Sequence, residues 1–473
     1  MVIVKRVLVP AVLAAILLSS SCGSQPEETP ARIKPPAVST IEEPVEKIIA
    51  ENSAYVLDGK NVYDRRPDKD KITYASQRLP GASAIYAKNG ASVTFSNPVI
   101  TGNGYLTDDD LKNELASKYG YASAVLVHGA GAEVTLKKPA IITSPDSNAN
   151  GGFATCGGKL NIYGGTITTN NRLGHGLDAT YGGTIYAEGT TIHTSGQNSG
   201  ALATDFGGGF ITVRNVKATA EVAGSPGIYC AGNSVIKAYD SIFESHGCEA
   251  VMAAHDNGYT FLYNCTVTGA VGLNGHNSMS AEYSYITMQG GTLNSTKGAL
   301  ITEMGGKTDM TLEKVKAGNI ANGQLIAPES GRLRVTLSCM NVSGDIVRAP
   351  KSYLEISLKN TKLNAPITAT VVNLDAESVW KVTGESRIVD LTLADSKCIT
   401  SEKEMTVYYH TLKIGGKSIT GDHTVGKVKF VYSADLIDDY EEPGPPGPPP
   451  GEGGPPGGPP PGGAPPGAPP SAP

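Results

Sequence analysis

The chain has 473 residues and a formal charge of −6 at neutral pH, from 39 Lys and Arg against 45 Asp and Glu. Because the basic residues are dispersed and form no patch, we expect no nucleic-acid partner. Of the aromatic residues, 21 are Tyr against seven Phe and one Trp, so much of the aromatic area carries a hydroxyl group suited to a wet surface.

Residues 1–22 predict an export signal. Lys5 and Arg6 precede an apolar run over residues 7–18, and three serines then lead to Cys22. Small residues before a cysteine resemble the bacterial lipoprotein signal, in which that cysteine carries the lipid, although Ser stands three places before Cys22 where the pattern has Leu. An ordinary cleaved secretory peptide is the alternative. No later stretch reaches the roughly 20 apolar residues that span a bilayer, so we predict a cell-envelope or cell-surface protein that is attached to the membrane through lipid on Cys22.

Both ends of the exported chain are predicted to be extended. Residues 23–52 are polar and proline-bearing with no periodic apolar pattern, which predicts a flexible tether. At the other end, 16 of the 31 residues from Pro443 to Pro473 are Pro, and nearly all the others are Gly or Ala. The three-residue period of collagen is lost after the first few residues, so residues 436–473 are predicted to be a disordered tail.

The body of the chain contains an internal repeat with a period close to 25 residues. In each of twelve repeats, two residues separated by one position, nearly all apolar, are followed two positions later by a recurring turn residue, here called the corner position. Nine of the twelve are Gly, Asn or Asp, which tolerate a left-handed backbone. The corner positions are Asn97, Lys138, Gly164, Gly189, Asn215, Asp240, Asn264, Gly290, Lys314, Cys339, Asn360 and Gly384.

The pair before each corner position predicts a short strand with one buried face. Val93 with Phe95 is the first such pair, Trp380 with Val382 is the last, and only Thr260 breaks the apolar rule. One short strand per repeat excludes a helical solenoid and favours an all-β fold, a right-handed parallel β-helix of about 12 coils. We assign residues 53–395 to this β-helix and residues 396–435 to a C-terminal β region that caps its open strand edge.

The interval between the first two corner positions is longer than the others. Within it, Thr107 is followed three residues later by Asp110, which resembles a capping box, so we predict a short helix in this N-terminal insert. Calcium binding by the aspartates at 108–110 is the alternative, but their spacing lacks the alternating ligands of a calcium loop.

If Cys22 carries a lipid, six cysteines remain, and they mostly fall at different phases of the repeat. Residues placed in this way lie too far apart for disulfides, so we expect single buried thiols. They are Cys156, Cys230, Cys248, Cys265, Cys339 and Cys398.

Four segments carry a family resemblance. They are residues 199–209 (SGALATDFGGG), 225–229 (SPGIY), 343–347 (SGDIV) and 380–384 (WKVTG). They resemble bacterial surface proteins of the pectin-lyase-like, right-handed β-helix type, which are often described as adhesin-like. The resemblance implies the fold and a place at the cell surface, but it implies no particular activity, because fold does not determine function.

One motif of this fold type suggests chemistry. Polygalacturonase-like hydrolases contain a Gly-His-Gly motif, which Gly174, His175 and Gly176 match. That family also has an Asn-x-Asp, an Asp pair and an Arg-x-Lys, and the sequence lacks them at the expected places. A histidine in a turn explains the motif better, so we predict no catalytic residues.

The stretch around this motif is nevertheless the richest in polar candidates. Aligning the coils on their paired small residues places Asp205 and His255 in one column, about 10 Å apart. Asp205, His255, Asp178 and His175 are therefore the residues to test for catalysis, with an ion or ligand site and ordinary exposed turn residues as the alternatives. No metal site and no cofactor are predicted, and calcium is the one candidate ion.

The residue before each corner position should point outward, so these residues form a column along the coils. Tyr163, Arg214, Tyr239 and Tyr263 belong to this column. Arg214 can stack its guanidinium group on the neighbouring Tyr239 ring, and the column is the predicted ligand-binding surface. A cross-strand ladder that only stabilises the sheet explains it equally well.

Together these observations predict an exported, lipid-anchored β-helix that binds a polysaccharide or cell-surface glycan without catalysis, as an adhesin does. A lyase or glycoside hydrolase acting on acidic polysaccharide is the first alternative. A purely structural envelope protein is the second.

Overall fold

The computed structural model describes residue 37 and residues 40–59, 62–65, 72–145, 149–255, 257–277 and 282–440. The predicted signal peptide, Cys22 and the chain beyond Tyr440 lie outside the described residues. Contacts divide the chain into Met1–Lys34 and Pro35–Pro473, and all described residues belong to the second unit.

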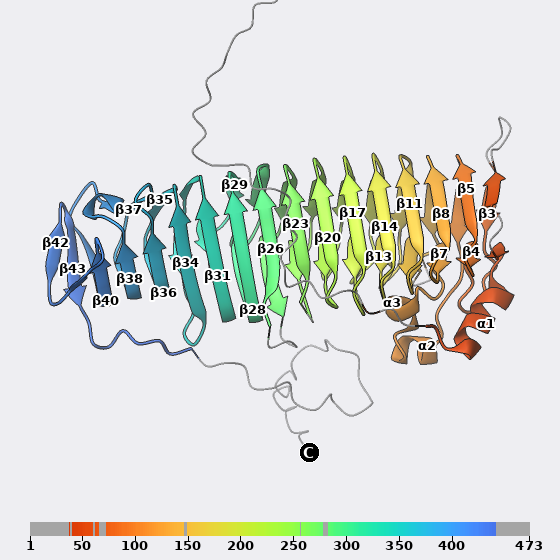
Figure 1. The fold of residues 1–473 in the computed structure, drawn as a ribbon, viewed down its shortest axis with the longest axis horizontal. Coiled ribbons are helices and arrows are strands. Elements are labelled where there is room, and N and C mark those ends of the chain that lie inside the picture. Colours follow the sequence, from red (N-terminus) through yellow and green to blue (C-terminus); the bar gives the residue numbers. More distant parts are fainter. Residues whose placement is uncertain are drawn as a thin grey trace, which may run out of the picture. The chain divides into compact units, whose positions relative to one another are not determined.

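The described residues form an all-β, right-handed parallel β-helix, which confirms the predicted fold class (Figure 1). It has about 14 turns, slightly more than expected. Most coils contribute one strand to each of three faces, and strands of successive coils pair in parallel. The first two faces form one sheet, because β28 (Ile301–Glu313) pairs with strands of both.

The strands are grouped by face as follows. The first face contains β1 (Val56–Asp58), β4 (Ile85–Lys88), β7 (Val125–His128), β10 (Gly152–Thr155), β13 (Leu177–Ala179), β16 (Leu202–Thr204), β19 (Ile228–Cys230), β22 (Glu249–Ala253), β25 (Val271–Asn277), β30 (Gln324–Ile326) and β33 (Asp345–Val347). The second face contains β2 (Val62–Arg65), β5 (Ser92–Ser96), β8 (Glu133–Lys137), β11 (Lys159–Tyr163), β14 (Thr184–Glu188), β17 (Phe210–Arg214), β20 (Val235–Tyr239), β23 (Tyr259–Tyr263), β26 (Ser284–Gln289), β31 (Ser330–Ser338), β34 (Tyr353–Lys359), β36 (Ile367–Leu374), β38 (Ser386–Leu393), β40 (Met405–Ile414) and β43 (Val428–Tyr432). The third face contains β3 (Thr73–Ala75), β6 (Val99–Gly102), β9 (Ala140–Thr143), β12 (Thr166–Thr169), β15 (Thr191–Thr194), β18 (Lys217–Ala220), β21 (Ile242–Ser245), β24 (Thr266–Gly269), β27 (Thr292–Ser295), β29 (Lys316–Ile320), β32 (Asn341–Ser343), β35 (Lys362–Ala365), β37 (Val379–Val382) and β39 (Ile399–Thr400), and a 3-10 turn, η1 (Ser396–Cys398), precedes β39.

The predicted corner lies between the second-face and third-face strands of a coil. Eleven of the twelve corner positions have a positive φ, as the Gly, Asn and Asp pattern predicted. Lys138 (φ 51°), Lys314 (φ 54°) and Cys339 (φ 54°) adopt the same conformation, although a Cβ atom is strained there. Gly384 is the exception.

The prediction is wrong for the last repeat because the coils become shorter. Ile356 pairs with Val372, and Val372 pairs with Leu391, so these steps are only 16 and 19 residues long. Trp380, predicted to be the equivalent of Ile356, instead lies opposite Leu363 on the third face. The corner position counted from Trp380 is therefore out of phase with the other eleven.

The predicted apolar pairs line the interior of the coils. All of them are buried, and Thr260, the one polar member, is also fully buried. The parallel register stacks equivalent residues, with Val93 opposite Val134 and Phe95 opposite Leu136. Each such side chain contributes about 1.5–3 kcal/mol through burial, and most of its contacts are with neighbouring coils.

Three helices, α1 (Glu43–Asn52), α2 (Asp108–Lys112) and α3 (Leu115–Tyr119), cover the outside of the first coils (Figure 1). The predicted capping box is confirmed, since the Thr107 amide donates to Asp110 Oδ2 at 2.7 Å and the Asp110 amide donates to Thr107 Oγ1 at 3.2 Å. The tether prediction is wrong over its last ten residues, which form α1, because Ile41 and Ile49 are buried in an apolar cluster outside the coils. Among the described residues no helix is long and apolar enough to cross a bilayer.

At the C-terminal end, β40 and β43 continue the parallel pairing, while β41 (Lys417–Ile419) and β42 (His423–Val425) pair antiparallel with them. The cap assigned to residues 396–435 stays a prediction. The boundary at residue 436 is too early for the disordered tail, because Asp439 forms an ion pair with Arg348 and Tyr440 packs against the ring of Tyr353.

The cysteines mostly follow the expectation of single thiols. Cys156, Cys230, Cys248, Cys265 and Cys398 are free.

Candidate functional site

The outward side chains of the first face form a column that includes a buried carboxyl group. In order along the coils, the column contains Tyr86, Leu126, Phe153, Asp178, Ala203 and Tyr229. The first three belong to the apolar cluster that the helices cover. Asp178 is the central residue of β13 and is fully buried, although its neighbours Leu177 and Ala179 are the ones that point into the interior.

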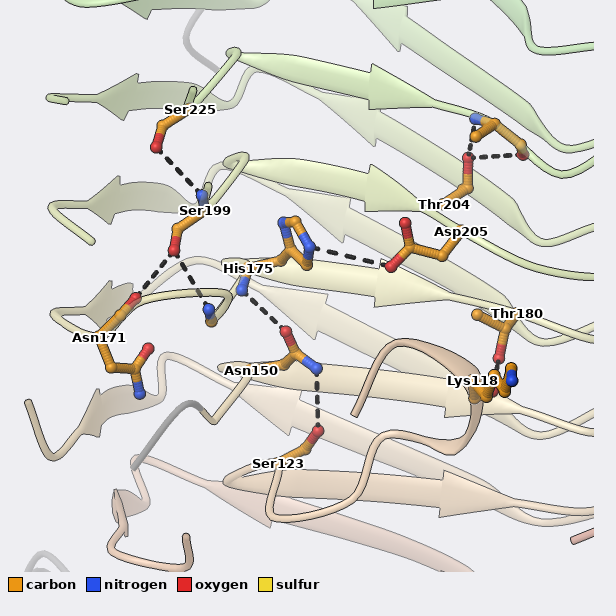
Figure 2. A network of polar contacts seen from close by, with 12 residues as sticks. Lys118, Ser123, Asn150, Asn171, His175, Thr180, Ser199, Thr204, Asp205 and Ser225 are labelled. Carbon is orange, nitrogen blue, oxygen red and sulfur yellow. Dashed lines mark hydrogen bonds and ion pairs between the residues drawn. The ribbon is translucent and has the colours of Figure 1, made fainter. Parts of the chain in front are cut away.

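His175 and Asp205 lie beside Asp178. His175 precedes β13, and Asp205 follows β16 in the next coil. His175 Nε2 lies 3.9 Å from Asp205 Oδ2 (Figure 2), and one ligand atom from each of the three residues lies within 4.8 Å of the others. The structure thus brings three of the four predicted candidates together, in what we call the acid–histidine cluster.

Hydrogen bonds between coils fix the backbone around His175 (Figure 2). The His175 amide donates to Asn150 Oδ1 at 2.8 Å, and the Gly174 amide donates to Ser199 Oγ at 3.1 Å. The Ser199 amide in turn donates to Ser225 Oγ at 3.0 Å. Each of these buried groups would cost about 1–3 kcal/mol of stability if left unpaired. The turn that carries the His175 imidazole is therefore held firmly in place.

The helical insert reaches the cluster directly. Ser117 of α3 lies near the Asp205 carboxyl group and acts to lower its pKa against the larger effect of burial. Thr180 Oγ1, at the end of β13, donates to the Lys118 carbonyl oxygen at 2.8 Å (Figure 2). The insert that the sequence places before the second corner position therefore forms one wall of the cluster.

Tyr229 forms another wall. Its ring lies parallel to the His175 imidazole, with 6.5 Å between the ring centroids. The His175 and Asp205 side chains are 10% and 12% exposed, whereas Asp178 has no exposed surface. A water molecule or small ion could reach the outer two residues, but a polymer could not reach Asp178.

Burial dominates the protonation of the cluster. It raises the pKa of Asp178 well above its usual range, and the Asp205 carboxyl group adds to that shift. It also raises the pKa of Asp205, against the opposing effect of His175, and it lowers the pKa of His175, against the opposing effect of Asp205. The cluster therefore favours a neutral imidazole and resists two carboxylate charges together.

Polar atoms of the cluster lack partners. The Asp178 and Asp205 carboxyl groups lie close enough to share a proton, but neither Asp178 oxygen has a hydrogen bond of acceptable geometry. His175 Nδ1 is also buried without a hydrogen-bond partner. Unpaired buried polar atoms are rare in native proteins and call for an explanation such as a bound ion.

His255, the fourth predicted candidate, does not belong to the cluster. Its ring lies against His276, with 5.7 Å between the centroids. The register pairs Thr204 with Cys230 and Cys230 with Ala253, so the alignment that placed Asp205 and His255 in one column was one residue out between β16 and β19.

The predicted outward column of the second face has the expected register. Its members in successive coils are Lys137, Tyr163, Glu188, Arg214, Tyr239, Tyr263, Gln289 and Glu313. The Arg214 guanidinium carbon lies 3.9 Å from the centroid of the Tyr239 ring, which confirms the predicted stack. Tyr239 and Tyr263 stack in turn, with 4.8 Å between centroids and 12° between planes.

The stack determines which parts of this column are available to a ligand. Arg214 and Tyr263 both pack against Tyr239, so the faces of that ring are already in contact and its edge and hydroxyl group point outward. Within the part of the chain that the structure describes, Arg214 forms no ion pair. Tyr163 is 41% exposed, and its ring also contacts Tyr186. Among the described residues, the column therefore offers hydroxyl groups, the Arg214 guanidinium group and part of the Tyr163 ring to a ligand.

A second buried acid, Glu303, points into the interior of the coils. It lies on β28 opposite Gly275, and a Cβ atom at Gly275 would be only 2.0 Å from Glu303 Oε2. The carboxyl group is fully buried, and burial raises its pKa from 4.5 to about 8 despite the opposing effect of the nearby Thr308 hydroxyl group. The sequence does not indicate this buried carboxyl group, because the space for it is supplied one coil away by Gly275, in a repeat that resembles the others.

A scan against models of known protein families finds no match to this chain. A search of the curated proteins also finds no significant match.

Proposed function

We propose that the protein is an exported, lipid-anchored cell-surface β-helix that binds glycan without catalysis, similar to the adhesin-like proteins of pectin-lyase-like fold that its sequence resembles. The observation that carries this proposal is the column of Tyr163, Arg214, Tyr239 and Tyr263. Its members come from four separate coils, so a polymer lying along the β-helix would contact each of them in turn.

The chemistry of the column favours an acidic glycan. Guanidinium groups bind carboxylates through two parallel hydrogen bonds. Arg214 is stacked on Tyr239 and lies opposite Glu188 of the preceding coil, with which it forms no ion pair among the described residues. Tyr hydroxyl groups donate and accept hydrogen bonds with sugar hydroxyls. The exposed Tyr163 ring offers an apolar surface against which a sugar can pack.

The test is retention of acidic and neutral polysaccharides by the purified full-length protein, with parallel assays for reducing ends and for unsaturated ends. We expect retention of acidic polysaccharides, weakened by salt, and no product. Retention that is equal for neutral polysaccharides would contradict the role of Arg214. Absence of any retention would favour a purely structural envelope protein.

Cleavage of acidic polysaccharide is the second candidate, and the paired carboxyl groups of Asp178 and Asp205 are the observation in its favour. Two features weigh against it. Asp178 is fully buried, and Lys118, the basic residue of the adjacent helix, contacts Glu114 and the Phe206 ring. Product formation that Asp205→Asn abolishes would establish cleavage and overturn the non-catalytic proposal.

A further inference from the structure

We propose that His175, Asp178 and Asp205 form a binding site for one divalent transition-metal ion of the Zn²⁺ or Mn²⁺ type. The site is separate from the glycan-binding column, because its residues lie on the first face and at its edge, whereas the column lies on the second face.

The donor set selects this class of ion. One imidazole nitrogen with two carboxylate oxygens suits Zn²⁺ and Mn²⁺, whereas Ca²⁺ and Mg²⁺ prefer oxygen ligands alone. The three ligand atoms come from two successive coils and converge within 4.8 Å. His175 and Asp178 are three residues apart, and parallel stacking of the next coil brings Asp205 beside them.

The distance between two of the ligand atoms is close to the spacing of ligands around a bound metal ion. Tetrahedral ligands at about 2.1 Å from zinc lie about 3.4 Å from one another. The His175 Nε2 to Asp205 Oδ2 distance is 3.9 Å, so a movement of about half an ångström, within the freedom of the Asp205 side chain, would bring this pair to the ligand spacing.

An independent observation points to a ligand. Asp178 is fully buried, and neither of its oxygens has an acceptable hydrogen bond to any residue that the structure describes. A buried carboxylate without a cation or donors is costly, and an ion between Asp178 and Asp205 would neutralise both groups. The column also leaves room beside Asp178, because its neighbour in the next coil is the small residue Ala203.

The surroundings supply what a metal site usually has around its ligands. The His175 backbone is fixed by Asn150, and Ser117 of α3 lies beside Asp205. Such outer contacts orient the ligands and strengthen metal binding. Because Ser117 belongs to the helical insert, a bound ion would also fasten α3 to the coils.

A second group of histidine and glutamate side chains, on the protein surface, provides a control for metal binding. On the third face, Glu221 contacts both His193 and His246, with 3.6 Å to His193 Nδ1 and 2.6 Å to His246 Nδ1. These side chains are 40%, 33% and 56% exposed for His193, Glu221 and His246. They could also bind zinc in solution, so His246→Gln is the control for Asp178→Asn.

The experiment titrates the chelator-treated full-length protein with Zn²⁺, Mn²⁺ and Ca²⁺ by calorimetry, and it records the melting temperature with each ion. We expect one equivalent of Zn²⁺ or Mn²⁺ that raises the melting temperature, and weaker binding of Ca²⁺. Asp178→Asn should reduce the affinity at least tenfold, because even loss of an outer contact costs about 10–100-fold. His246→Gln should leave this binding intact.

Folding of the variant is checked by the melting temperature in chelator. Asp178→Asn is expected to melt close to the wild-type temperature there, because Asn matches the shape of the protonated carboxyl group, and to lose the increase with metal. If Asp178→Asn fails to fold, Asp205→Asn at the partly exposed edge takes its place. Metal binding that survives either substitution, or that His246→Gln alone removes, would overturn the proposal, as would binding of Ca²⁺ in preference to Zn²⁺ and Mn²⁺.

Discussion

The buried Glu303 predicts a stability that falls as pH rises. Its pKa is about 8 in the folded protein against an ordinary value of 4.5, so the folded state keeps the proton that the unfolded state loses. Below pH 4.5 the Glu303 carboxyl group is protonated in both the folded and the unfolded state, so it does not make the stability depend on pH. Between the two values, the free energy of unfolding should fall by about 1.4 kcal/mol per pH unit.

The size of the effect follows from the same two values. The difference between about 8 and 4.5 corresponds to about 5 kcal/mol when the shift is complete and to about 3 kcal/mol at pH 7. Glu303→Gln keeps the shape of the neutral side chain and cannot ionise. The variant should therefore match the wild type near pH 4.5 and exceed it increasingly toward pH 8.

The assay is denaturant unfolding followed by circular dichroism at half-unit steps from pH 4.5 to 8.5. Glu329→Gln is the matched control, because Glu329 is exposed and lies next to Glu303 in the following coil, where its amide donates to the Glu303 carbonyl oxygen at 2.9 Å. The control should keep the wild-type pH dependence. Parallel curves for the wild type and Glu303→Gln would refute the reasoning.

Three further substitutions test the fold. Thr107→Ala removes the cap of α2 and should destabilise the insert by about 1 kcal/mol. We expect faster hydrogen exchange in the insert with little change in the global melting temperature, and unchanged exchange would contradict this prediction. Lys314→Asn relieves a strained corner at φ 54° and should stabilise by up to about 1 kcal/mol, measured as a higher melting temperature; a lower one would count against the strain. Trp380→Ala leaves a large cavity and removes the hydrogen bond from the indole to the Ala365 carbonyl oxygen. It should cost about 3–5 kcal/mol, whereas a loss below 1 kcal/mol by denaturant unfolding would show that the ring does not support the last coils.

The sequence predicts the repeating part of the structure well because local rules set it. An apolar pair followed by a left-handed corner recurs with little change, so even Lys138 and Cys339 could be placed at corners from their spacing. The capping box of Thr107 and Asp110 is likewise local. These features depend on a few adjacent residues and on the period.

The prediction fails where the period changes or where distant residues meet. The shorter coils after Ile356 put Trp380 out of phase, since the regular count continued through them. The acid–histidine cluster depends on the register between coils, and a shift of one residue paired Asp205 with His255 and missed its proximity to His175. Rules on single residues cannot detect such an error.

Helix α1 was also not predicted from the sequence. α1 begins and ends with polar residues, and it is held against the coils by tertiary packing of Ile49 and of Ile41, which precedes the helix. A polar stretch with such weak periodicity resembles a tether in sequence. The cover that the helices form over Phe153 also explains why the outward-pointing Asp178, next in the same column, is buried.

The central claim is that the outward column of the second face binds glycan, and the most direct test compares two kinds of tyrosine. Tyr163, in the column, is 41% exposed, and Tyr432, outside it, is 48% exposed, so their replacement by Ala removes similar surface. The measurement is the dissociation constant for an acidic polysaccharide of the wild type, Tyr432→Ala, and the variant with Ala at positions 163, 214, 239 and 263. We predict at least a tenfold loss of affinity in the column variant, corresponding to about 1.4 kcal/mol, and wild-type affinity in Tyr432→Ala. Equal affinity of all three proteins, with the column variant correctly folded, would contradict the proposed function.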